Sequence, residues 1–170
     1  MRVLVTGAYG LIGAACLARL YRDGHEVTGA GRAIAQAERR APYAKWIAAD
    51  YRKLTLAGDW LPLLDGFDAV VNCVGVLQDG MRDDVQRIHV AATSALFAAC
   101  ERAGVKRVVH ISAIGASRSA PTAFARSKAE AEDDLSRRPI DWVILRPGLV
   151  LAPQVYGGTA MLRGLAGVPP

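Results

Sequence analysis

The stretch VTGAYGLIGAACLARL, residues 5–20, decides the fold of this chain. It begins within the apolar run RVLVT and carries Gly7, Gly10 and Gly13 before a run with helical periodicity. Because glycine has no Cβ, a turn of this kind lets the backbone approach a ligand and lets the helix pack close to the strand. The helix N-terminus then faces the ligand, which suits a pyrophosphate. The stretch therefore predicts a dinucleotide-binding turn, and the alternative is a glycine-rich turn without a ligand.

Short runs rich in Val and Ile alternate with helical patterns along the rest of the chain. The predicted strands are 2–6, 26–30, 45–49, 68–74, 106–112 and 141–146. The predicted helices are roughly 11–23, 33–40, 53–64, 81–103 and 122–137. Near-continuous apolar strands separated by helices are typical of a parallel sheet covered on both faces, the doubly wound α/β class. Such sheets bind ligands beyond the carboxyl ends of their strands.

Length and composition fit one folded domain and argue against several classes of function. The chain has 170 residues, of which 52% are hydrophobic and 22% charged, and its net charge of +5 includes no long run of like charges. We therefore expect no nucleic-acid binding, and no apolar stretch is long enough for a transmembrane helix. Cys16, Cys73 and Cys100 lack metal-ligand spacing and stand in apolar contexts, so we expect reduced thiols, no metal site and a cytoplasmic protein.

The pattern changes after Pro147. We expect residues 1–150 to form the dinucleotide-binding domain, whereas 151–170 hold several glycines and prolines without strong periodicity. This last segment is expected to begin a smaller substrate-binding lobe that is incomplete here. We therefore expect the chain to be a fragment of a longer protein.

The ends of the second and third strands indicate which dinucleotide fits. Sites for NAD usually carry an acidic residue after the second strand, where this chain has Arg32. A guanidinium suits a 2′-phosphate, which favours NADP over NAD, and the alternative is an ordinary exposed arginine. Asp50, just after the third strand, is placed either to contact the adenine ring or to cap a helix.

Several motifs together resemble the short-chain dehydrogenase/reductase superfamily over residues 1 to about 150. They are TGAYGLIG, the aspartate after the third strand, VVNCVG, HIS, the AFARSK helix and LRPG. The glycine spacing and the RPG ending look like the extended and atypical branches, which include nucleotide-sugar epimerases and dehydratases. HISAIGAS followed by FARSKAEAE is most similar to the atypical branch related to an accessory subunit of respiratory complex I. The resemblance implies a Rossmann fold and an oxidoreductase or epimerase-like activity on a carbonyl or sugar-nucleotide substrate.

In that superfamily a serine polarises the substrate carbonyl, a tyrosine transfers the proton, and a lysine four residues further on holds the nicotinamide ribose. The resemblance places these roles at Ser112, Phe124 and Lys128, so a phenylalanine stands at the tyrosine position. Phenylalanine can neither donate nor accept a proton, and its lack of a hydroxyl should cost about 10² to 10⁴ in rate. Without the resemblance, AFARSKAEAEDDL reads as an amphipathic helix in which Lys128 pairs with Glu132.

The glycine turn and the resemblance together imply a set of cofactor-binding residues. They are Thr6, Gly7, Tyr9, Gly10, Leu11, Ile12, Gly13, Arg32, Asp50, Tyr51, Cys73, Val74, Gly75, Lys128, Pro147 and Gly148. His89 matches a family asparagine, and the alternative to a catalytic base is a packed histidine on a helix face. Three groups could replace the missing acid: Ser112 through water, Tyr156 in the last segment, and Tyr9, which we expect close to the phosphates and on the nicotinamide side.

Two functions stay open from the sequence. The first is an NADP-dependent oxidoreductase or epimerase-like enzyme, with NAD as the other possible cofactor, in which a different group supplies the proton. The second is a non-catalytic dinucleotide-binding module with a sensing, structural or assembly role. The resemblance also implies that a homodimer could form through the helices at 81–103 and 122–137.

Overall fold

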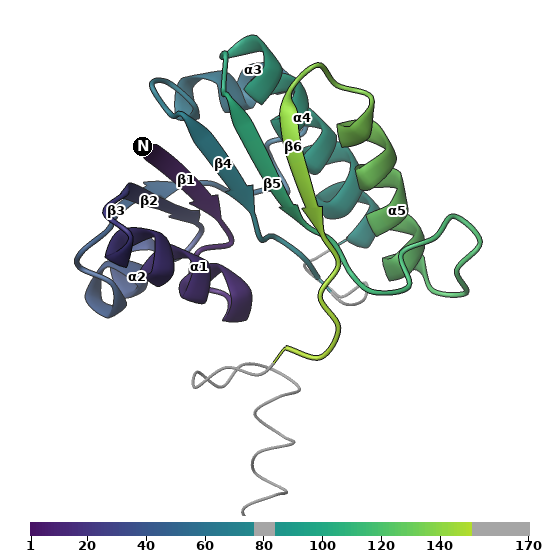
Figure 1. Cartoon of the computed structure of the whole chain (residues 1–170), viewed down its shortest axis with the longest axis horizontal. Coiled ribbons are helices and arrows are strands. Elements are labelled where there is room, and N and C mark those ends of the chain that lie inside the picture. Colours follow the sequence, from purple (N-terminus) through teal and green to yellow (C-terminus); the bar gives the residue numbers. More distant parts are fainter. Residues whose placement is uncertain (77–83, 151–170) are drawn as a thin grey trace, which may run out of the picture.

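The computed structural model describes residues 1–76 and 84–150, which form a three-layer α/β domain (Figure 1). Its sheet has six parallel strands in the order β3-β2-β1-β4-β5-β6. They are β1 (Arg2–Thr6), β2 (Glu26–Gly31), β3 (Lys45–Ala48), β4 (Ala69–Asn72), β5 (Arg107–Ile111) and β6 (Asp141–Leu145). The strand order changes direction between β1 and β4, where ligands bind in sheets of this kind. The predicted doubly wound α/β class is confirmed.

Helices cover the two faces of the sheet unequally. On one face lie α1 (Leu11–Arg22) and α2 (Ile34–Arg40), beside the half of the sheet that contains β1, β2 and β3. On the other face lie α3 (Ala57–Trp60), η1 (Leu61–Leu63), the π-helix η2 (Arg87–Ala92), α4 (Thr93–Arg102) and α5 (Ala123–Ser136). Within the described residues, every helix is too short or too polar to cross a lipid bilayer.

Three elements differ from the predicted ranges. The strand predicted at 68–74 ends at Asn72, because the chain then leaves the sheet. The helix predicted at 53–64 begins only at Ala57, where the Asp59 carboxylate accepts the Leu56 N–H. The helix predicted at 81–103 starts outside the described residues, and its described part contains η2 before α4. The expected start of a second lobe at 151–170 also lies outside the described residues.

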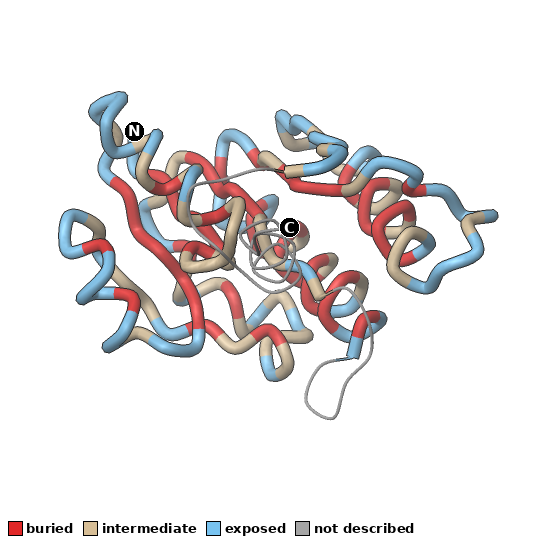
Figure 2. Tube along the Cα trace, turned by 90° about the horizontal axis from the view of Figure 1, so that it is seen from below, coloured by how far each residue is buried: buried red, intermediate tan, exposed pale blue. Residues whose placement is uncertain are grey.

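The apolar core forms one layer on each side of the sheet. The layer under α3, α4 and α5 includes Trp60 and Phe97, both fully buried, and the Tyr51 ring packs edge-on against Trp60 at 4.9 Å between ring centroids. The layer under α1 includes Leu17 and Val5. Figure 2 shows these buried residues running along the strands and along one side of each long helix. The sheet is thus the rigid element from which the strand ends project.

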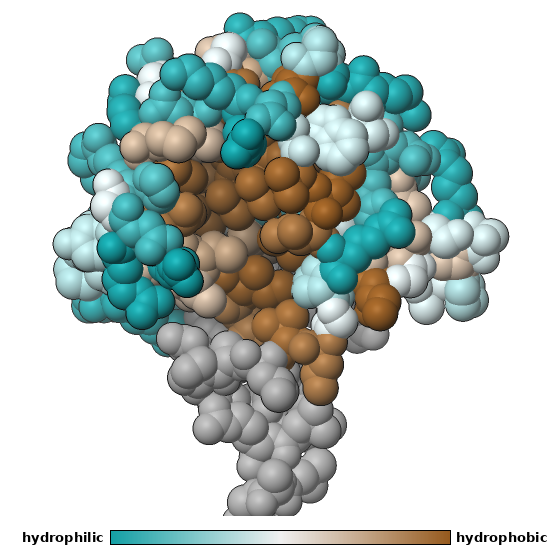
Figure 3. Space-filling model, in the orientation of Figure 1, coloured by the Kyte–Doolittle hydropathy of each residue, from teal (hydrophilic) through white to brown (hydrophobic). Residues whose placement is uncertain are grey.

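The edge strand β6 is covered on one face only by the described part of the chain. Val143 and Leu145 are 39% and 48% exposed, beside Val109 of β5. Figure 3 shows an apolar area across this face, in the same view as Figure 1. The strand ends that form the site lie next to it, at the lower edge of the sheet.

Gly13 sets how closely α1 approaches β1. A Cβ at this position would lie 2.8 Å from the Gly7 carbonyl carbon and still closer to its oxygen. We therefore expect Gly13→Ala to lower the free energy of unfolding by about 1–3 kcal/mol, as overpacking does. Urea denaturation measures the change.

The matched control is Gly58→Ala in α3, where a Cβ meets nothing within 4 Å. Alanine has the higher helix propensity, so this variant should be unchanged or more stable by up to about 1 kcal/mol. Equal destabilisation by both variants would show that the contact at Gly13 does not constrain the fold.

Candidate functional site

The glycine turn joins β1 to α1 through backbone contacts alone. Gly7 has φ of 64°, and a Cβ there would lie 3.0 Å from the Cys73 carbonyl carbon. Gly10 donates its N–H to the Gly7 carbonyl at 2.9 Å and is the N-cap of α1. No side chain caps this helix start, and its first turn contains no acidic residue. The first N–H groups of α1 are therefore available to an anionic ligand.

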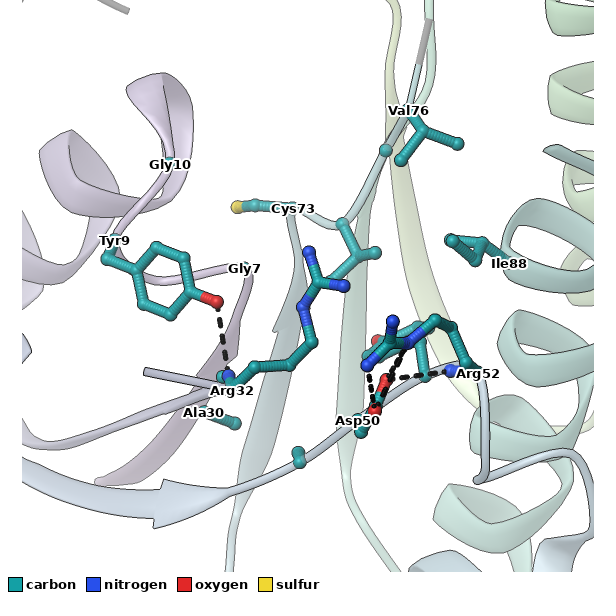
Figure 4. Close-up of a pocket in the computed structure, with 15 residues that line it drawn as sticks. Gly7, Tyr9, Gly10, Ala30, Arg32, Asp50, Arg52, Cys73, Val76 and Ile88 are labelled. Carbon is teal, nitrogen blue, oxygen red and sulfur yellow. Dashed lines mark hydrogen bonds and ion pairs between the residues drawn. The ribbon is translucent and has the colours of Figure 1, made fainter. Parts of the chain in front are cut away.

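A cavity with an empty volume of about 660 Å³ opens beside this turn, at the carboxyl ends of β1, β2, β3 and β4 (Figure 4). Nine of the predicted residues line it: Gly7, Tyr9, Gly10, Arg32, Asp50, Tyr51, Cys73, Val74 and Gly75. The structure thus brings together strand ends that are far apart in the sequence.

Six further residues line the cavity that the sequence did not reveal. They are Ala30, Gly31, Ala49, Arg52, Val76 and Ile88. Arg52 had a usable signal, because it follows Asp50 by two residues between a predicted strand and a predicted helix. Val76 and Ile88 reach the cavity through the packing of η2, which no local pattern indicates.

The remaining predicted residues lie outside the cavity wall. Gly13 serves the packing of α1, whereas Leu11 and Ile12 form its first turn and are half-buried. The Pro147 carbonyl accepts the Ile114 N–H at 3.1 Å, and Gly148 is exposed. Tyr156 lies outside the described residues.

Tyr9 lies at the end of β2. Its hydroxyl accepts the Arg32 N–H at 3.1 Å, and its ring lies so close to Gly31 that a Cβ there would be 3.0 Å from the Tyr9 Cζ. Lys128, by contrast, reaches the ends of β4 and β5, on the other side of β1. The expectation that Tyr9 could stand in for the missing acid near Phe124 is therefore wrong. Figure 4 shows the Arg32 side chain pointing into the cavity.

Asp50 forms an ion pair with Arg52 at the edge of the cavity, with 2.6 Å between Oδ2 and Nη2. Hydrogen bonds from Arg52 lower the pKa of Asp50 below its usual value. The helix-cap alternative for Asp50 is wrong, because the N-cap of α3 is Leu56. Asp50 instead begins the turn at 50–54, in which its carbonyl accepts the Lys53 N–H at 2.9 Å.

A buried polar network fixes the ends of β1, β4 and β5. The Thr6 hydroxyl donates to Asn72 Oδ1 at 2.8 Å, and the Tyr51 hydroxyl lies 2.9 Å from both oxygens. Asn72 Nδ2 donates to Nδ1 of His110 at 3.2 Å. Burial raises the pKa of Tyr51 well above its usual value, so the phenol stays protonated. The side chains of Thr6 and Tyr51 therefore hold the strand ends together.

Lys128 is buried in α5, and its ammonium is bound by backbone. Nζ donates to the Ile111 carbonyl at 2.9 Å and to the Val74 carbonyl at 3.4 Å. Burial lowers the pKa of Lys128 to about 8. A Cβ on Gly75 would lie 3.5 Å from Nζ, so this glycine lets the cavity wall pass close to the lysine. The lysine stands directly behind the cavity.

Ser112 and Glu132 form a second buried cluster at the end of β5. The Ser112 hydroxyl donates to the Glu132 carboxylate, which also accepts two hydrogen bonds from Arg146, one of them 2.9 Å long. The expected pairing of Lys128 with Glu132 is wrong, since no hydrogen bond joins them and Glu132 turns to Arg146 instead. A serine has one hydroxyl proton, so Ser112 in this arrangement has none to donate to a substrate carbonyl.

His89 holds the backbone beside Phe124. Its Nε2 accepts the Val76 N–H at 2.9 Å, so Nδ1 carries the proton and donates to Ser127 Oγ at 2.9 Å. Ser127 in turn donates to the Phe124 carbonyl at 2.8 Å. Burial lowers the pKa of His89 to about 3, so the ring is neutral. The Phe124 ring packs edge-on against it, with 5.5 Å between centroids. His89 is therefore a packed histidine with satisfied partners.

Comparison with known families and proteins identifies related chains. The model of an NAD(P)H-binding family matches residues 7–164. An uncharacterised protein of Mycobacterium tuberculosis is 28% identical over 169 residues, which is 99% of this chain and 17% of that protein. A UDP-glucose 4-epimerase of Mycolicibacterium smegmatis is 33% identical over 141 residues, 75% of this chain and 44% of the relative.

Solved structures share the fold. The Bordetella bronchiseptica enzyme WbmH, crystallised with NAD+, has a TM-score of 0.79 at 21% identity, over 97% of this chain and 62% of that one. The chain thus spans less than half the length of the two curated relatives and under two thirds of this structure.

The buried ammonium of Lys128 predicts a pH dependence of stability. Its pKa is about 8 in the fold and about 10.4 in an unfolded chain, so between these values the unfolded state binds more protons. The free energy of unfolding should therefore rise with pH across this window, by at most about 1.4 kcal/mol per pH unit. Urea denaturation of the wild type and of Lys128→Met at several pH values isolates this contribution as the difference between them.

Lys53→Met removes an exposed lysine and is the matched control. Its pH dependence should follow that of the wild type. If the free energy of unfolding of Lys128→Met also changes with pH as that of the wild type does throughout this window, burial does not lower the pKa of Lys128.

Proposed function

We propose that this chain, which belongs to the NAD(P)H-binding family, binds a nicotinamide dinucleotide in the cavity at the ends of β1 to β4 and prefers NADP. The observation that carries the proposal is the uncapped start of α1 at Gly10, which borders this cavity without an acidic residue in its first turn. A pyrophosphate placed there would accept hydrogen bonds from N–H groups that lack a side-chain cap. Gly7, Gly10 and Gly75 keep the wall free of side chains at the points of closest approach.

The preference for NADP rests on the charges at the ends of β2 and β3. Arg32 occupies the place where a carboxylate would accept hydrogen bonds from the ribose of NAD, and its side chain points into the cavity. Among the described residues that line the cavity, Asp50 is the one carboxylate, and it is paired with Arg52. The guanidinium groups of Arg32 and Arg52 line the same end of the cavity. Such an environment favours the additional phosphate of NADP.

The second part of the proposal is that the site binds the dinucleotide without rapid turnover. Hydride transfer to a carbonyl needs a proton donor, and Phe124 has none. Ser112 donates its proton to Glu132, and His89 is neutral with both ring nitrogens engaged. The superfamily resemblance assigns proton chemistry to these three positions. At none of them is the residue free to transfer a proton to a substrate. A role in sensing or assembly fits such a site.

A second candidate is an oxidoreductase or epimerase-like enzyme acting on a carbonyl or a sugar nucleotide. The observation that favours it is Lys128, whose pKa of about 8 lies near neutral pH and whose Nζ lies behind Gly75 of the cavity wall. An ammonium with this pKa can act as a general acid. One relative is named a UDP-glucose 4-epimerase, which makes UDP-glucose a substrate to test. The lobe that would select a substrate is proposed to begin at 151–170.

The NADP preference predicts the effect of removing Arg32. In calorimetric titrations the wild-type chain should bind NADPH more tightly than NADH. Arg32→Ala should lose about 1.5–3 kcal/mol of NADPH binding, the range of a hydrogen bond to a charged group, and should leave NADH binding nearly unchanged. Arg39→Ala on the exposed side of α2 is the matched control. Equal loss for both dinucleotides would refute the phosphate preference but not dinucleotide binding.

The two candidate functions differ in their response to a restored hydroxyl. For the binding module we expect no NADPH oxidation by the wild type with UDP-glucose or a panel of carbonyl compounds. Phe124→Tyr should gain turnover of up to about 10² to 10⁴ over that background, because it supplies the missing acid. Phe67→Tyr adds a hydroxyl far from the site as the control. Wild-type turnover as fast as that of Phe124→Tyr would favour the enzyme, with Lys128 as the acid.

A further inference from the structure

The hydroxyl of Tyr9 lies at the end of β2, although the residue belongs to the glycine turn. It accepts the backbone N–H of Arg32 at 3.1 Å, across 23 positions of the sequence. Figure 4 shows the ring reaching from the turn to this N–H. Both residues line the cavity. Tyr9 therefore brings a polar side-chain atom from the glycine turn to the strand end at which Arg32 stands.

The missing side chain of Gly31 lets the Tyr9 ring take this position. A Cβ at Gly31 would lie 3.0 Å from Tyr9 Cζ and still closer to Cε1, so a larger residue would displace the ring. Gly31 is buried in β2, and its carbonyl accepts the Ala49 N–H at 3.0 Å. The backbone beneath the ring is thus held by the sheet, and the place of the hydroxyl is fixed by packing as well as by its hydrogen bond.

The Tyr9 hydroxyl keeps a proton that its hydrogen bond with Arg32 does not use. A phenol both donates and accepts, and here its oxygen accepts from a backbone N–H. Within residues 1–76 and 84–150, no group accepts a hydrogen bond from it in return. An accepted hydrogen bond polarises the O–H group and strengthens its own donation. The hydroxyl is therefore a donor for an acceptor in the cavity.

The neighbouring groups indicate which acceptor fits. A site for NAD has a carboxylate at the end of the second strand, which accepts hydrogen bonds from the ribose hydroxyls. Here the side chain at that place is the Arg32 guanidinium, which only donates. The Tyr9 proton adds a second donor beside it. A phosphate offers several oxygens and negative charge to such donors, whereas a ribose hydroxyl offers one neutral oxygen.

We propose that the Tyr9 hydroxyl is a ligand of the 2′-phosphate of NADP and that Tyr9 and Arg32 together select NADP over NAD, a role that rests on the proposed dinucleotide binding. Tyr9 donates its O–H to one phosphate oxygen, and the Arg32 guanidinium binds other oxygens of the same group. The alternative is that the hydroxyl only connects the glycine turn to β2. A connection of that kind shapes the cavity for both dinucleotides, so its loss would weaken NADH and NADPH binding by the same factor.

Tyr9→Phe removes the hydroxyl and keeps the ring over Gly31. In calorimetric titrations this variant should bind NADPH about 10- to 150-fold more weakly than the wild type, the range of a hydrogen bond to a charged group. Its affinity for NADH should be nearly unchanged. Adenosine 2′,5′-bisphosphate and adenosine 5′-monophosphate, which differ only in the 2′-phosphate, should show the same contrast.

The matched control is Tyr21→Phe in α1. Tyr21 is 48% exposed, its ring packs against Tyr43, and it is not among the described residues that line the cavity. This variant should bind both dinucleotides as the wild type does, and circular dichroism should show that each variant is folded.

A second pair of variants tests whether the hydroxyl binds the phosphate itself or only orients Arg32. Arg32→Ala retains the backbone N–H, so the Tyr9 hydroxyl keeps its hydrogen bond in that variant. Adding Tyr9→Phe to Arg32→Ala should therefore weaken NADPH binding further. No further loss would overturn the direct contact with the phosphate.

The titrations also separate this role of Tyr9 from the proposed function. Equal weakening of NADH and NADPH binding by Tyr9→Phe would overturn the proposal, as would NADPH binding that Tyr9→Phe leaves unchanged. In both cases dinucleotide binding itself would stand. A wild type that binds neither dinucleotide would instead refute the proposed function, and the role of Tyr9 with it.

Discussion

The contact between the Gly13 Cα and the Gly7 carbonyl is the constraint from which the arrangement of the site follows. It allows α1 to start immediately after β1 and to lie against the sheet, which any side chain at position 13 would prevent. The helix start is thereby held at the gap between β1 and β4, where the strand order changes direction. The position of the uncapped helix start thus depends on one close approach of backbone to backbone.

The other half of the site is held by buried polar groups rather than by close backbone packing. His89 fixes the N–H of Val76, and Lys128 binds the carbonyls of Val74 and Ile111. Buried backbone N–H and C=O groups beyond the end of a strand need such partners, because each one left without a hydrogen bond costs about 1–3 kcal/mol of stability. These side chains therefore determine where the chain runs after β4, and with it one wall of the cavity.

The sequence predicts the fold and the glycine turn because both depend on local patterns: apolar runs for strands and missing side chains for close approach. It fails where a residue has several possible partners. Glu132 is spaced to pair with Lys128 along the helix, but Arg146 from the end of β6 reaches it instead. Tyr9 stands in the glycine turn, yet its ring lies over Gly31 at the neighbouring strand. The packing of segments that are distant in the sequence determines which partner such a residue contacts. Spacing along the chain does not indicate that packing.

The presence of Ser112 and Lys128 does not by itself argue for catalysis, because each has a structural role in this chain. Ser112 joins β5 to α5 and, through Glu132, to Arg146 at the end of β6. Lys128 satisfies two carbonyls at the ends of β4 and β5, and replacing it with an apolar residue would leave both without this donor. A tyrosine at position 124 would have no comparable role, because the Phe124 ring already packs against His89. In the proposed binding module, the missing phenolic hydroxyl at position 124 removes proton chemistry and leaves this packing in place.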